Sequence, residues 1–114
     1  MIKIYGIKTC GSVKKAFAFF KDHNIDYEFV DFKKDQQDNA KIAQWVKLAG
    51  IDVVLNKKGT SYRTAGLSKL ELSDEQKIEH MSQTNLLIKR PIIEYKNELV
   101  VGFDEERYTN TFTN

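Results

Sequence analysis

The amino-acid sequence predicts a small α/β domain in which helices cover a central mixed β-sheet. Three observations carry this prediction. The 114 residues match the size of one domain, so we expect residues 1–114 to fold as a single unit. Strand and helix patterns follow the order β-α-β, then a largely helical middle section, then β-β-α. The composition, 41% hydrophobic with six Gly and one Pro, is that of a globular protein with its own core.

The same composition excludes several other classes. It does not fit collagen, low-complexity disorder or a disulfide-rich secreted scaffold. No apolar run reaches the roughly 18 residues that cross a bilayer, and the N-terminus lacks the apolar core of a signal peptide. We therefore expect a soluble cytoplasmic protein that does not enter the membrane. The net charge of only +2 does not indicate a nucleic-acid partner.

The first third of the chain is expected to form a β-α-β unit. Ile2–Tyr5 and residues 25–32 are rich in the β-branched and aromatic residues of strands. A helix should begin near Cys10, with Thr9 as its N-cap. Its apolar residues recur at the spacing i, i+3, i+4, i+7 and are Val13, Ala16, Phe17 and Phe20.

Helices should dominate the middle of the chain. One helix has an apolar stripe and ends at Gly50, a residue suited to a helix C-cap. The stripe consists of Ile42, Trp45, Val46 and Ala49. Residues 52–66 are mixed and turn-like. Another helix should start at Ser73, because Gln76 three residues later completes a capping box.

The last third predicts a β-hairpin and a final helix. Residues 92–95 and 99–101 are strand-like on either side of the turn at Lys96 and Asn97. Acidic residues 104–106 suit the first turn of a helix. A parallel first pair of strands and an added hairpin together give a mixed sheet.

Cys10 is the only cysteine and the strongest candidate for chemistry. One thiol forms neither an internal disulfide nor a multi-cysteine metal site, and we expect no bound metal. At the start of a helix, unpaired amides and the helix dipole lower the pKa of a thiol, and Lys8 and Lys14 would add positive charge. Gly11 would let a ligand approach closely. The alternative is that Cys10 is an inert residue at a strand–helix corner.

Arginine is rare in this chain. Of 18 basic residues only three are Arg, namely Arg63, Arg90 and Arg107. Arginine offers a planar fork of donors where lysine offers a point charge. Each arginine is therefore a candidate anion ligand, the alternative being an ordinary surface charge.

Four segments resemble one family. Residues 5–16 contain a single cysteine followed by Lys14 four residues later, and three further segments follow in the family's order and spacing. These segments are residues 55–60, 87–93 and 101–105. Together they resemble the arsenate-reductase-like (ArsC/Spx) family, and within it the YffB-type branch, over nearly the whole chain.

The resemblance implies a thioredoxin-like (glutaredoxin-like) fold with a helical insertion at about residues 38–85. It also implies that Pro91 follows a cis peptide bond and faces Cys10, which brings Arg90 beside the sulfur. Catalysis would then depend on Cys10, Lys14 and Arg90. Substrate or thiol binding would involve Gly11, Ser12, Pro91, Asn56 and Arg63.

The sequence departs from the arsenate-reducing members at two arginine positions. These members hold the oxyanion with three arginines, whose positions correspond to Asn56, Arg90 and Phe103 here. Two lost guanidinium groups would cost several kcal/mol, at about 1.5–3 kcal/mol for each charged hydrogen bond. Arg63 could still reach the site, whereas Arg107 should lie on the outer face of the last helix.

The expected activity is therefore thiol-dependent reduction of a small thiol or oxyanion substrate by Cys10. With no second cysteine, glutathione as co-substrate or a glutaredoxin partner must resolve the intermediate, and no tightly bound cofactor is expected. Two alternatives remain open. One is an arsenate reductase of low efficiency, and the other is an Spx-like regulator that docks on RNA polymerase.

Overall fold

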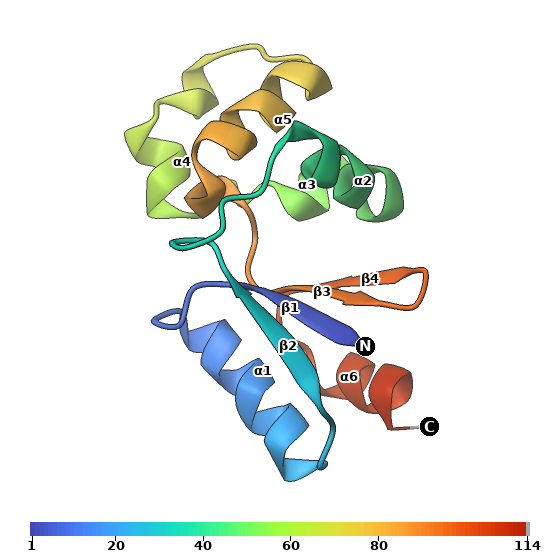
Figure 1. Ribbon diagram of the computed structural model, residues 1–114. Helices are drawn as coiled ribbons and strands as arrows, with labels where there is room; N and C mark the ends of the chain where they lie inside the picture. Colours follow the sequence, from blue (N-terminus) through green and yellow to red (C-terminus); the bar gives the residue numbers. More distant parts are fainter. Residues whose placement is uncertain (114) are drawn as a thin grey trace.

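The computed structural model describes residues 1–113 and has a mixed four-stranded sheet at its centre (Figure 1). The sheet order is β2-β1-β3-β4, with β1 parallel to β2 and antiparallel to β3, and β3 antiparallel to β4. The strands are β1 (Ile2–Gly6), β2 (Tyr27–Asp31), β3 (Ile92–Tyr95) and β4 (Glu98–Val101). The predicted mixed sheet and its hairpin are confirmed.

Two helices cover one face of the sheet (Figure 1). They are α1 (Gly11–Asp22) and α6 (Glu105–Phe112), whose first turn is capped by the Asp104 carboxylate. Alternate residues of β1, including Ile4, point into this layer and pack against Phe20 and Tyr108. This layer holds the first hydrophobic core.

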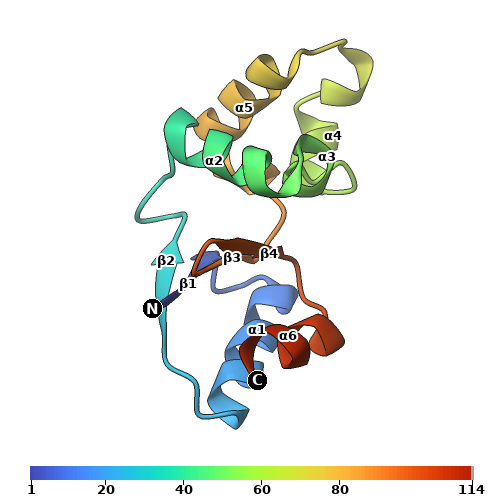
Figure 2. The ribbon, with the colours of Figure 1, turned by 90° about the vertical axis from the view of Figure 1, so that its right-hand side faces the viewer.

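The chain between β2 and β3 forms a helical lobe over the opposite face (Figures 1 and 2). The predicted helical insertion is therefore confirmed. Its helices are α2 (Asn39–Ala49), α3 (Ile51–Val54), α4 (Thr60–Thr64), η1 (Leu67–Lys69), α5 (Asp74–Gln83) and η2 (Asn85–Leu87). The prediction of a turn-like segment at 52–66 was wrong in part, because α3 and α4 are short helices that bury Val54 and half-bury Tyr62.

The ends of the longer insertion helices follow the expected rules. Gly50 ends α2 with φ 97°, a conformation that favours glycine. Ser73 and Gln76 form the predicted capping box at the start of α5. These ends fix the helices whose apolar sides, with buried Trp45, build the second core against the sheet.

A polar network joins the lobe to the sheet. Glu94 of β3 accepts hydrogen bonds from the Tyr5 hydroxyl at 2.7 Å, from Trp45 Nε1 at 2.9 Å and from Lys41 Nζ at 3.1 Å. Burial alone would raise the pKa of Glu94, but the donors of Trp45, Tyr5 and Lys41 outweigh it and hold the pKa below its usual value. The ionised carboxylate therefore ties α2 to β1 and β3.

Among residues 1–113, none of the helices combines the length and the hydropathy of a membrane span.

Candidate active site at Cys10

Cys10 lies where the chain passes from β1 into α1. It is the N-cap of α1, with the extended backbone angles φ −73° and ψ 128°. The prediction that Thr9 is the N-cap was wrong, because a turn closed by the bond from the Cys10 amide to the Ile7 carbonyl, 3.2 Å, delays the helix by one residue. The thiol therefore occupies the position from which a side chain meets the free amides of the first helical turn.

Gly6 fixes how closely α1 approaches the sheet. A Cβ at this position would lie 2.8 Å from Val13 Cγ2 and 3.8 Å from Arg90 Cβ. The Gly6 carbonyl also accepts a hydrogen bond from the Phe32 amide at 2.9 Å. Sequence reasoning missed this role by assigning Gly6 to a loop, although a glycine directly before the cysteine loop is a signal of close packing.

Arg90 reaches the same place from the far end of the insertion. The Arg90–Pro91 peptide bond is cis, as the resemblance implied, and Pro91 is buried. Arg90 Nη1 donates to the carbonyls of Leu86 at 2.8 Å and Ile88 at 3.2 Å. These bonds hold the stem of Arg90 against Gly6, beside the start of α1.

Cys10 is half-buried, and its surroundings favour the thiolate. Burial alone would raise the pKa of the Cys10 thiol. The Val13 amide, the Arg90 guanidinium and the Ser12 amide together outweigh this effect and bring the pKa below its ordinary value. The Cys10 side chain makes no capping hydrogen bond in the structure, and an anionic sulfur could accept from these same donors.

One polar atom in the site lacks a partner. Arg90 Nε is buried, and within residues 1–113 it has no hydrogen-bond acceptor. A buried donor without an acceptor costs about 1–3 kcal/mol. An anionic sulfur, or an anion bound beside it, would remove that cost.

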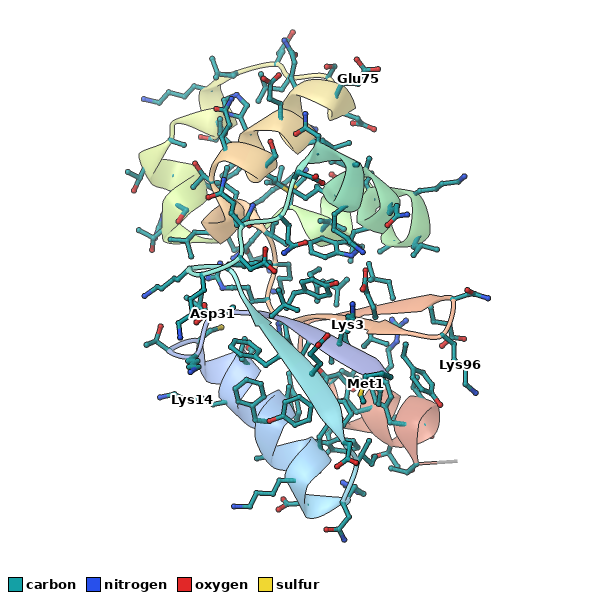
Figure 3. The ribbon with its side chains drawn as sticks, in the orientation of Figure 1. Met1, Lys3, Lys14, Asp31, Glu75 and Lys96 are labelled. Carbon is teal, nitrogen blue, oxygen red and sulfur yellow. The ribbon has the colours of Figure 1, made fainter. Side chains whose placement is uncertain are left out.

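The lysines predicted to activate Cys10 are not the main source of the shift. Lys8 and Lys14 are exposed, and neither is among the principal causes of the lowered Cys10 pKa. Figure 3 shows the Lys14 side chain extending outward from α1. Gly11 is exposed with open space around its Cα, so a ligand could approach there, and Ser12 contributes its amide.

The remaining predicted binding residues lie in different places. The Asn56 amide donates to the Leu87 carbonyl at 2.9 Å, which sets Asn56 beside the segment that leads to Arg90. Arg63 is exposed in α4, and no hydrogen bond or ion pair within residues 1–113 links it to Cys10 or Arg90.

Two further residues, Phe103 and Arg107, make contacts that stabilise the fold. The Phe103 ring packs against Tyr108 with centroids 5.0 Å apart, so it belongs to the core side of α6. Arg107 Nη2 donates to the Leu99 carbonyl at 3.3 Å. Among the arginines of residues 1–113, Arg90 is the one whose guanidinium lowers the pKa of Cys10.

The described part of the chain, residues 1–113, has no cluster of three His, Cys, Asp or Glu side chains placed to hold a metal ion. The site instead offers a thiolate, the amides of a helix start and a guanidinium. This arrangement suits nucleophilic attack by sulfur and stabilises negative charge on a neighbouring group.

Comparisons with known proteins identify the family of this chain. An uncharacterised protein of Haemophilus influenzae is 35% identical over 98% of this chain and 99% of its own length. The global transcriptional regulator Spx 2 of Lactococcus lactis is 28% identical over 93% of this chain and 82% of its own length. The arsenate reductase of Rhizobium meliloti is 27% identical over 81% of this chain and 67% of its own length.

Solved structures match over nearly the same extent. A YffB protein superposes with a TM-score of 0.91 at 32% identity, covering 96% of this chain and 97% of the other. An arsenate reductase (ArsC) related protein from Brucella melitensis gives a TM-score of 0.75 at 33% identity, covering 99% and 95%. The model of the ArsC family matches residues 5–111. The chain therefore belongs to the ArsC family and has its thioredoxin-like, glutaredoxin-related fold.

Proposed function

We propose that this protein is a thiol-dependent reductase that acts on disulfides through Cys10. The observation that carries the proposal is the position of the sulfur at the start of α1, where amides and Arg90 lower its pKa. A thiolate at neutral pH is the nucleophile of thiol–disulfide exchange. The Arg90 guanidinium would hold the attacking sulfur and the charge that develops on its partner.

The reaction needs an external thiol, because Cys10 is the only cysteine. The Cys10 thiolate attacks the glutathione sulfur of a mixed disulfide, and the substrate leaves as a thiolate that takes up a proton. A second glutathione, or a glutaredoxin thiol, then attacks the new Cys10–glutathione disulfide. This step releases a disulfide between glutathione and the attacking thiol and restores the Cys10 thiolate. Two electrons thus pass from the external thiols to the substrate.

Arsenate is a weaker substrate candidate. The partly buried Phe103 packs against the core and Asn56 carries no charge, so Arg90 alone would face a dianion beside the sulfur. Arsenate-reducing members hold the oxyanion with three arginines, whereas this chain keeps one at those positions. We therefore expect arsenate turnover to be slow.

The proposal is tested by replacing the nucleophile. Cys10→Ser should remove at least 99% of the reduction of the mixed disulfide of glutathione and 2-mercaptoethanol. The oxidation of glutathione is followed with glutathione reductase and NADPH, and arsenate is assayed in parallel with glutaredoxin. Persistent turnover in Cys10→Ser would refute the mechanism, and a higher kcat/KM for arsenate than for the disulfide would favour the arsenate reductase.

A regulatory role is the second candidate, because Spx regulators match 93% of this chain. Such a protein would bind RNA polymerase, and Cys10 would be a redox sensor or have no role. Affinity capture of the purified polymerase α subunit separates the two functions. Capture that is unchanged by Cys10→Ser, together with no disulfide turnover, would favour the regulator.

A further inference from the structure

A polar cleft lies between the sheet and the helical lobe, next to the loop that carries Cys10. Its volume is about 590 Å³, within the range of ligand sites. The sheet side is formed by Tyr5 and Val30, and the lobe side by Lys34 and Lys41. Lys8, two residues before Cys10, also lines the cleft and connects it to the candidate active site.

The cleft opens along β2, which is an edge strand. The sheet order places β2 last, and neither view of the ribbon shows an element beyond it (Figures 1 and 2). The Phe32 amide donates to the Gly6 carbonyl of β1. Because backbone N–H and C=O groups point to alternate sides along a strand, the N–H and C=O groups of Tyr27 and Phe29 point away from β1, to the open side. The outer edge of β2 therefore offers unpaired N–H and C=O groups to an extended chain.

The free edge leads to the sulfur. β1 and β2 are parallel, and the register pairs Gly6 with Asp31 at the end from which the Cys10 loop departs. Figure 3 shows Asp31 beside this loop and Lys3 farther along the sheet. The strands β1 and β3 are each paired on both sides, and the other edge strand, β4, lies on the far side of β3 from β1, the strand that leads to Cys10. β2 is thus the open strand edge that ends beside Cys10.

The charges along the cleft suit a polypeptide with no strong net charge. Lysines and acids alternate there, and Lys8, Lys34 and Asp35 have no ion-pair partner within residues 1–113. A ligand with charges of one sign, such as a polyphosphate, would be repelled by Asp31 and Asp35 while it was attracted by the lysines. Main-chain pairing with β2 requires no particular side chains, which is the recognition mode of an added strand.

We propose that the edge of β2 and the adjoining cleft bind, in extended conformation, the polypeptide segment that carries the disulfide reduced by Cys10. This inference rests on the proposed function and assigns its substrate class, a glutathionylated protein or peptide. The bound segment pairs with Tyr27 and Phe29 and directs its cysteine toward the start of α1. Cys10 takes the glutathionyl group, and the peptide leaves the cleft as a free thiol.

The first experiment measures binding without chemistry. Isotope-labelled Cys10→Ser protein is titrated with a ten-residue peptide whose single cysteine is joined to glutathione, and amide hydrogen exchange is followed by NMR. The Tyr27 and Phe29 amides should exchange at least tenfold more slowly at saturation. Unchanged exchange at both amides would overturn the inference, whether or not the enzyme turns over.

The second experiment compares Phe29→Pro with Phe29→Ala. Both variants lose the ring, but only proline removes the outward N–H, and edge strands accept proline at such positions. The readout is kcat/KM for the glutathionylated peptide divided by kcat/KM for the mixed disulfide with 2-mercaptoethanol. This ratio should fall at least fivefold in Phe29→Pro and remain near the wild-type value in Phe29→Ala.

The outcomes separate the two proposals. Equal ratios in the two folded variants would overturn the docking site and leave the reductase intact. Absence of turnover on both substrates in the wild type would refute the reductase, and the exchange measurement would then decide on the docking site alone. If Phe29→Pro does not fold, the exchange measurement on the Cys10→Ser protein also decides.

Discussion

Two polar clusters lie near the start of β3, only four residues apart in sequence, and they differ in completeness. Glu94 receives hydrogen bonds from three residues in two elements, namely Tyr5 of β1 and Lys41 and Trp45 of α2. Arg90 satisfies two carbonyls through Nη1, yet its buried Nε has no acceptor within residues 1–113. One cluster is closed, and the other retains capacity to bind negative charge.

The difference separates a structural role from a chemical one. A satisfied buried network fixes the groups that form it, which is why Glu94 joins the helical lobe to the sheet. An unpartnered buried donor is rare in proteins and calls for a functional explanation. At Arg90 the proposed explanation is the adjacent Cys10 sulfur, because the guanidinium lowers the pKa of this thiol.

The largest effect on stability is expected from Glu94→Ala. The variant leaves the buried Trp45 Nε1 and Tyr5 hydroxyl without their acceptor and leaves Lys41 unpaired. We expect a loss of about 3 kcal/mol in the free energy of unfolding, the lower end for breaking a buried pair. Urea denaturation measures this loss.

The control for Glu94→Ala is Glu98→Ala, an exposed carboxylate in the same hairpin. It should change stability by less than about 0.5 kcal/mol. The rate of Cys10 alkylation in the native Glu94→Ala protein should stay within twofold of the wild type. A large change in alkylation without a loss of stability would reverse the roles assigned to the two clusters.

Arg90→Leu should act mainly on the chemistry. It removes the guanidinium that lowers the Cys10 pKa, so less thiolate is present at pH 7. We expect disulfide reduction to fall roughly 10- to 100-fold, since a charged hydrogen bond contributes about 1.5–3 kcal/mol. The pH dependence of iodoacetamide alkylation should shift to higher pH in parallel.

Arg90→Lys is the matched variant, because it keeps the charge but not the planar fork. It should lie between the wild type and Arg90→Leu in both rate and alkylation. Alkylation profiles that coincide for all three proteins would show that Arg90 does not act on the sulfur.

Most of the fold could be predicted from the sequence, and so could the place of Cys10 near the start of a helix. Periodicity and capping residues located the strands, α1, α2, α5 and the hairpin, because these are local properties of the chain. The short helices α3 and α4 were not predicted, since their lengths of four and five residues carry no apolar period. In α3 the fully buried Val54 packs in the core, a long-range contact that a local pattern does not reveal.

The candidate site depends on long-range contacts that residue spacing does not reveal. Cys10 was predicted from its place at a helix start, which is local. Its pairing with Arg90, 80 residues away, came from the family resemblance. Helical spacing put Lys14 on the side of Cys10 but did not show that its side chain is exposed, and Lys14 is not among the principal causes of the lowered Cys10 pKa. The Glu94 network was not predicted, because its donors are scattered over residues 5, 41 and 45.

Gly6→Ala should lower the stability of the protein and slow the alkylation of Cys10. The added Cβ would meet Val13 Cγ2 at 2.8 Å and would push the start of α1 away from β1. Overpacking of this kind costs about 1–3 kcal/mol, and the displaced amides should also slow Cys10 alkylation. Gly11→Ala is the control, because its Cβ would meet no atom within 4 Å. Equal stability and alkylation in the two variants would show that Gly6 does not fix α1.

The smallest expected effect is a pH-dependent difference in stability between the wild type and Cys10→Ser. The pKa of Cys10 is lower in the folded protein than in the unfolded chain, where a thiol has a pKa of about 8.5. The folded state therefore releases its proton first, and this contribution to stability is complete above the unfolded pKa and is lost as pH falls through the folded pKa. Urea denaturation at pH 6 and pH 9.5 should show the wild type gaining stability relative to Cys10→Ser as the pH rises. A constant difference would mean that the folded protein does not favour the thiolate, and Arg90 would then be as inert toward Cys10 as the closed Glu94 network is.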